Sequence, residues 1–99
     1  MVTVHKGEAE PKPLDPQLAL RQHSRSGFEW AVAGVGAAQL ALALAMDLLN
    51  DPVRALDVYT LLEFALVVRL PKNGWTLTEV QLRQVVEQGE QRRRSPKLR

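Results

Sequence analysis

His23, Ser24 and Glu29 are the residues of this sequence whose types and spacing could support catalysis. A histidine, a hydroxyl and a carboxylate are the base, nucleophile and orienting group of a hydrolytic triad, but in such sites the fold, and not sequence proximity, brings them together. We therefore rank an enzyme last among the possible functions. His5 and His23 lack cysteine partners or the helical two-histidine spacing of a zinc site, so we expect no metal and no cofactor.

A glycine pair, Gly34 and Gly36, is a candidate phosphate-binding site, because glycines at the start of a helix can expose backbone N–H groups to a phosphate. The dinucleotide pattern requires a third glycine where this sequence has Gln39, and no phosphate-loop lysine follows. We favour a tight, closely packed turn. A ligand-binding loop is the alternative.

Glu63 falls inside the apolar face of a predicted helix, which is formed by Ala55, Leu56, Tyr59, Leu62, Leu66, Val67 and Leu70. An unpaired carboxylate in such a place is costly. We expect Glu63 to lie at the edge of this face with a partner such as Arg69 or an arginine of the C-terminal tail. A functional buried acid is the alternative.

The opposite side of the same helix is also apolar, with Leu61, Phe64, Ala65 and Val68. A surface helix of a monomer normally presents charge there. The pattern predicts a partner-binding face and a two-fold homodimer, and coverage by the chain's own third helix is the competing explanation.

Charge divides the chain into two parts. Residues 90–99 hold five Lys or Arg and one Glu, so this segment carries +4 and residues 1–89 carry −2. We predict one domain over 1–89 and a disordered basic tail over 90–99. The cations of this tail are the candidate nucleic-acid contacts: Arg92, Arg93, Arg94, Lys97 and Arg99.

The chain has 99 residues and no cysteine, which indicates a single small domain in a reducing cytoplasm. An apolar run between Trp30 and Met46 is at the short end of a membrane span and is mostly alanine and glycine, so we expect a buried helix and no membrane. The N-terminus does not resemble a signal peptide.

The expected fold class is α+β, a small two- or three-stranded sheet with three helices around a central Ala/Leu-rich helix. The strands are expected at Val2–His5, Phe28–Val32 and, as a third, Trp75–Leu77, and Lys6–Pro13 is expected to be a connecting loop. The helices are expected at about Ala37–Leu49, Pro52–Leu70 and Glu79–Gln88, with a short helical turn after Leu14–Pro16.

Three helix boundaries have side-chain signals. Asp51 and Pro52 suit the N-cap and first position of the second helix. Thr78 and Gln81 have the spacing of a capping box for the third helix, which Gly89 is expected to close.

The sequence resembles an uncharacterised family of small bacterial and mobile-element proteins over residues 13–86. The segments that carry the resemblance are Pro13–Pro16, His23–Ser24, Gly27–Trp30, Ala38–Leu44, Arg69–Pro71 and Gly74–Thr78. The family's glycine-rich loop after the Phe-Glu-Trp segment is changed here at Ala31, Val32, Ala33, Val35 and Ala37. The resemblance supports the architecture and implies no activity.

We expect a small non-catalytic protein-interaction module that self-associates through its second helix. A nucleic-acid-binding accessory protein that uses the basic tail is the alternative. A host-directed inhibitor from a phage or plasmid is the second alternative. Trp30 and Trp75 are expected to be core anchors.

Overall fold

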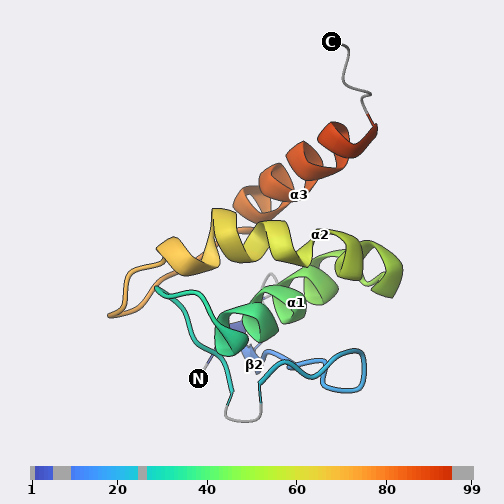
Figure 1. Ribbon diagram of the computed structural model, residues 1–99. Coiled ribbons are helices and arrows are strands. Elements are labelled where there is room, and N and C mark those ends of the chain that lie inside the picture. Colours follow the sequence, from blue (N-terminus) through green and yellow to red (C-terminus); the bar gives the residue numbers. More distant parts are fainter. Residues whose placement is uncertain (1, 6–9, 25–26, 95–99) are drawn as a thin grey trace.

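The structure is a computed structural model that describes residues 2–5, 10–24 and 27–94, apart from the side chains of residues 93 and 94. Its elements are strands β1 (Thr3–Val4) and β2 (Lys12–Pro13), helices α1 (Val35–Leu49), α2 (Pro52–Ala65) and α3 (Glu79–Arg94), and the short 3-10 helix η1 (Val67–Arg69) (Figure 1). Three helices with a small antiparallel sheet confirm the predicted α+β class.

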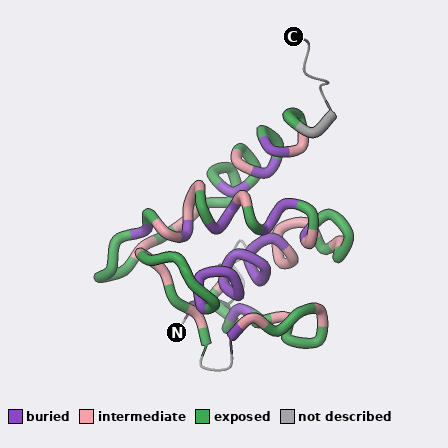
Figure 2. Tube along the Cα trace, in the orientation of Figure 1, coloured by how far each residue is buried: buried purple, intermediate pink, exposed green. Residues whose placement is uncertain are grey.

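Helix α1 is the centre of the core. Every residue from Gly36 to Ala45 is buried, so the helix is covered on all sides along ten consecutive positions (Figure 2). A helix that is apolar around its whole circumference has to be covered in this way. In Figure 1 α1 lies between α2 and the N-terminal segment that carries β2.

A tight connection turns α1 into α2. Asn50 adopts a left-handed conformation with φ 50°, and its N–H donates to the carbonyl of Met46 at 2.8 Å. The Asp51 carboxylate then accepts from the N–H groups of Val53 and Arg54, with Pro52 at the first helical position. The predicted cap is confirmed, and α2 runs back along α1.

Helix α3 starts at the predicted capping box. The Thr78 N–H donates to Oε1 of Gln81 at 2.8 Å, and the Gln81 N–H donates to Oγ1 of Thr78 at 3.1 Å. The predicted end at Gly89 is wrong, because α3 continues to Arg94. Gly89 is buried against Leu61 of α2, so the glycine serves a close helix contact and not a helix terminus.

The ends of the other two helices also differ from expectation. α1 begins at Val35, two residues before the predicted start, with Gly34 at the N-cap. α2 ends at Ala65 and is followed by η1, whereas one helix was predicted up to Leu70. Pro71 disfavours helical geometry in the residue before it, so the chain has to leave the α conformation before that point.

The sheet is smaller than predicted and has another partner. β1 pairs antiparallel with β2, Thr3 opposite Pro13 and Val4 opposite Lys12, and the Leu14 N–H donates to the carbonyl of Val2 at 2.9 Å. The prediction of a loop at Lys12–Pro13 is therefore wrong. Both strands of a two-stranded sheet are edges, where a proline is tolerated because its missing N–H faces away from the ladder.

The segments Phe28–Val32 and Trp75–Leu77, both within the described residues, form no strand. Ala31 has a φ of 70°, which interrupts an extended ladder, and its N–H donates to the carbonyl of Val67 at 3.0 Å. Most of the alternating apolar side chains still pack against the core, namely Phe28, Trp30, Trp75 and Leu77, whereas Val32 is 55% exposed. None of the described helices is long and apolar enough to cross a membrane.

Candidate functional site

The polar centre of the structure is the side chain of Gln39, which is fully buried in the middle of α1. Its Oε1 accepts from the backbone N–H groups of His23 at 2.6 Å and Ser24 at 3.1 Å. Its Nε2 donates to the carbonyls of Pro16 at 2.6 Å and Arg21 at 3.0 Å. Two accepted and two donated bonds use the full hydrogen-bonding capacity of a primary amide.

Local conformation prepares the loop of residues 16–24 for this contact. The Asp15 carboxylate accepts from the N–H of Gln17 at 2.9 Å, and Gln17 has a φ of 61°. The N–H groups of Leu20 and Arg21 then donate to the Gln17 carbonyl. The predicted helical turn is therefore only a hydrogen-bonded turn, and it brings two carbonyls and two N–H groups onto one amide.

The same loop holds His23 against α2. Nε2 of His23 lies 2.8 Å from the hydroxyl of Tyr59, and a guanidinium nitrogen of Arg21 donates to that hydroxyl at 3.3 Å. The ring centroids of His23 and Tyr59 lie 5.4 Å apart. Tyr59 is buried, so a polar atom at its end requires such partners.

The side chains of His23 and Glu29, two members of the suggested triad, contact different parts of the fold. His23 is engaged by Tyr59, whereas the side chain of Glu29 lies over the first turn of α1. A Cβ atom at Gly36 would stand 2.6 Å from Cγ and 2.8 Å from Oε1 of Glu29. Gly36 is thus the close-packing glycine that the sequence favoured. A phosphate at this turn would meet the Glu29 carboxylate, which itself gains from the positive end of the helix dipole.

Glu63 is buried, with 6% of its surface exposed, so its predicted position at the edge of the face is wrong. Among the described residues the ion pairs join Arg54 to Glu90 and Arg83 to Glu79, and none joins Glu63 to the predicted partner Arg69. The helical periodicity placed Glu63 correctly within the apolar face. The same periodicity could not predict which side chains lie next to Glu63 in the folded chain.

Helix α3 covers part of the predicted partner-binding face. Leu61 packs on Gly89, and Leu61, Ala65 and Val68 are each partly buried. Phe64 is different, since 53% of its surface is exposed. Coverage by the third helix, the competing explanation, thus applies to Leu61, whereas Phe64 stays exposed to solvent.

The exposed stripe of α2 consists of Val53, Asp57, Thr60 and Phe64. At 100° per residue these four positions fall within an arc of about 60°. Val53 is 77% exposed and stands at the opposite end of the stripe from Phe64. This exposed stripe therefore has an apolar residue at each end and polar residues in the middle.

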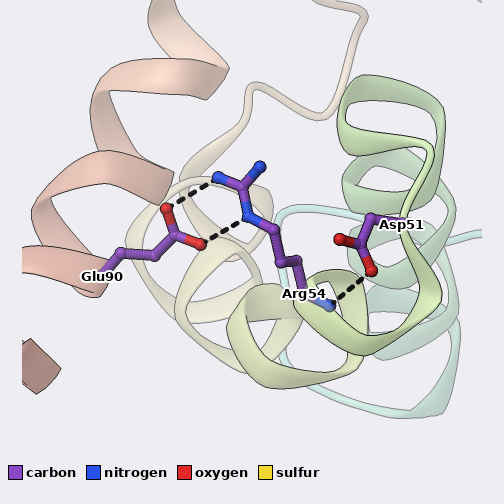
Figure 3. A network of polar contacts seen from close by, with 3 residues as sticks. All are labelled: Asp51, Arg54 and Glu90. Carbon is purple, nitrogen blue, oxygen red and sulfur yellow. Dashed lines mark hydrogen bonds and ion pairs between the residues drawn. The ribbon is translucent and has the colours of Figure 1, made fainter.

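An ion pair links the start of α2 to the last turns of α3. Nε and a terminal nitrogen of Arg54 each donate to Glu90 at 2.8 Å, while Asp51 caps the same turn of α2 (Figure 3). The hydrogen bond to Glu90 raises the pKa of the Arg54 guanidinium above its ordinary value. The pair fixes the position of Glu90, which the sequence had assigned to a disordered tail.

The predicted nucleic-acid contacts are only partly within the described residues. Arg92 is exposed on α3, and the backbones of Arg93 and Arg94 complete its last turn. Lys97 and Arg99 lie outside the described residues. In Figure 1 the C-terminal end of α3 projects beyond the other helices. Among the described residues no cluster of three His, Asp or Glu could hold a metal ion.

The role of Gln39 was not predicted. One signal pointed to it, since it is the single strongly polar residue between Trp30 and Met46 and a buried amide requires partners. Three of its four partners belong to segments that carried the family resemblance, Pro13–Pro16 and His23–Ser24, and the fourth is the carbonyl of Arg21 between them. Two other such segments meet where Trp30 and Trp75 pack edge to face with ring centroids 5.6 Å apart.

Comparison with known proteins gives a match to one protein family. Neither the curated proteins nor the solved structures give a match to the chain. A protein-family model matches residues 1–88, which is most of the chain and includes the Gln39 contacts and the start of α3. The chain therefore belongs to DUF6166, a family of unknown function.

Proposed function

We propose that this protein is a non-catalytic protein-interaction module that forms a homodimer through the exposed stripe of α2. The observation that carries the proposal is the pair of exposed apolar residues at the two ends of the stripe, Val53 and Phe64. Two of the groups considered for catalysis have structural contacts instead: His23 contacts Tyr59, and Glu29 packs on Gly36. A cytoplasmic location, which suits a chain without cysteine, belongs to the same proposal.

The order of residues along the stripe favours an antiparallel pair of α2 helices. In that orientation Phe64 of each copy packs on Val53 of the other, over a length of about 16 Å. Asp57 then faces Thr60 of the second copy, whose hydroxyl can donate to it. A parallel pair would place Asp57 beside its own copy, and like charges at such a distance repel.

The expected dimer is weak. Burying the exposed half of a phenylalanine contributes roughly 1 kcal/mol, and a two-fold axis doubles each contact. A single helix pair buries less than the roughly 800 Å² per partner of a stable interface, and association has its own entropic cost. We expect a dissociation constant of about 10 μM to 1 mM.

Sedimentation velocity across a hundredfold range of concentration tests this proposal. The wild type should shift from monomer towards dimer. Phe64→Arg and Val53→Lys should stay folded, because both side chains are exposed, and should associate clearly less than the wild type. Val80→Lys is the matched control, since Val80 is 64% exposed on α3, away from the stripe. A wild type that is monomeric at every concentration contradicts the proposal, as does a Val80→Lys variant that loses association equally.

Nucleic-acid binding through the basic segment is the second candidate. It is favoured by the ion pair of Glu90 with Arg54, which occupies the one acidic side chain of residues 90–99. Exchanging Arg92, Arg93 and Arg94 for glutamine should abolish binding to a random DNA duplex at low salt, and Arg83→Gln should not. Equal loss in the two variants, or no binding by the wild type, would remove this candidate.

A further inference from the structure

A hollow of about 680 Å³ lies beside the first turn of α3. It is lined by β1 and His5, by the last turns of α1 with Asp47, by Trp30, and by the segment from Gly74 to the start of α3 with Trp75 and Glu79. The chain has two tryptophans, and both line this hollow. Neither the sequence pattern nor the family match assigns it a role.

The lining combines aromatic rings with negative charge. The two indoles meet edge to face at an interplanar angle of 82°, a geometry in which one ring keeps both faces free of the other. Asp47 and Glu79 are the carboxylates of the lining, and the described residues contribute no lysine or arginine to the lining itself. Glu79 pairs with Arg83 at 2.7 Å on the exposed surface of α3, so an arriving cation would share this carboxylate with Arg83. Aromatic faces and carboxylates together suit a cation with a flat or apolar body.

Arginine is the side chain that fits this chemistry best. Its planar guanidinium stacks on aromatic rings and pairs with carboxylates, and it is less strongly hydrated than the ammonium group of lysine. The chain itself holds a dense cluster of such side chains, with four arginines and one lysine in residues 90–99. The opposite charges of the two parts, −2 for residues 1–89 and +4 for 90–99, favour contact between them.

We propose that this Trp-lined hollow binds the arginine-rich C-terminal segment of a second copy of the chain. Glu79 lines the hollow at the start of α3, and Arg94 ends the helix about 22 Å away at 1.5 Å per residue. The two surfaces thus lie at opposite ends of one rigid helix. The resulting contact is head-to-tail, and it is independent of the α2 pairing, which uses another face.

A synthetic peptide with the sequence of residues 90–99, EQRRRSPKLR, is the probe. It is titrated into the full-length Phe64→Arg variant, so that α2 pairing does not contribute. We expect saturable binding by fluorescence anisotropy of the labelled peptide, with a shift in tryptophan emission, since both tryptophans line the hollow. Raising the salt concentration from 50 to 500 mM should weaken binding at least fivefold.

Variants locate the contact. Glu79→Gln should weaken binding about fivefold and Trp75→Phe more than that, whereas Glu87→Gln, an exposed acid on another part of α3, should leave it unchanged. A peptide with glutamine at every Arg and Lys position should not bind. Binding of that peptide with equal affinity, an equal effect of Glu87→Gln, or no change in tryptophan emission would each overturn the proposal.

Discussion

Replacing Gln39 with leucine tests how the loop of residues 16–24 is held. Leucine is close to glutamine in volume and suits a buried helix position, so the substitution removes hydrogen bonds with little change in packing. Four backbone groups lose their partner at once, two N–H groups and two carbonyls. The variant therefore isolates the contribution of one amide to the fold.

The expected loss follows from those four bonds. Each contributes about 0.5–1.5 kcal/mol net, so Gln39→Leu should lower the free energy of unfolding by about 4 kcal/mol. The full penalty for four buried unpaired groups would be larger, but the loop can detach and expose them to water. A loss of about 4 kcal/mol is a large fraction of the stability of a small domain.

Urea denaturation measures the change in stability, and amide hydrogen exchange shows where it arises. The amide hydrogens of His23 and Ser24 should be protected in the wild type and exchange fast in Gln39→Leu, even under conditions where α1 and α2 remain folded. Gln84→Leu is the matched control, because Gln84 is exposed on α3. A loss below about 1 kcal/mol, or continued protection of those two amides, would refute the anchoring role.

Three further predictions concern α3 and the residues that follow it in the sequence. Thr78→Ala should cost about 1 kcal/mol in urea denaturation through loss of the cap, and Thr76→Ala should cost clearly less; equal costs would argue against the cap. Gly89→Ala should gain less than the about 0.5–1 kcal/mol that alanine normally gains over glycine in a helix, because its Cβ would displace the Cδ2 methyl of Leu61, and the gain should be larger in a Leu61→Ala background; equal effects in the two backgrounds would argue against that contact. Removing residues 95–99 should leave the thermal midpoint unchanged, since the Glu90 ion pair is kept; a fall of several degrees would show that these residues stabilise the domain.

Local signals in the sequence predicted the three helices and the starts of α2 and α3. Asp51 with Pro52 and Thr78 with Gln81 act within one helical turn, so their spacing is sufficient to identify them. The all-round apolar character of residues 37–49 likewise predicted the buried central helix. The burial of the second apolar side of α2 could not be predicted, because periodicity cannot tell whether Leu61 meets solvent or α3.

Contacts between distant segments were the part that could not be predicted. The strand partner of Val4 is Lys12, in a segment whose prolines and charges indicated a loop, and two-residue strands have too little pattern to assign pairing. Phe28–Val32 alternates like a strand, but the positive φ of Ala31 appears only in the structure. Gly89 resembled a helix end because glycine is common there, while its use here depends on Leu61, 28 residues away.

The most direct test of α2-mediated self-association is cross-linking at the middle of the exposed stripe. The chain has no cysteine, so Thr60→Cys introduces a single thiol, which the antiparallel pair places close to its copy. A short bismaleimide at a protein concentration of about 100 μM should convert this variant to covalent dimer, and Phe64→Arg in the same chain should prevent the reaction. Thr76→Cys, at an exposed position before α3, is the control. Rapid cross-linking of Thr60→Cys alone is the predicted result, and cross-linking to the same extent at both positions, or at neither, would contradict self-association through α2.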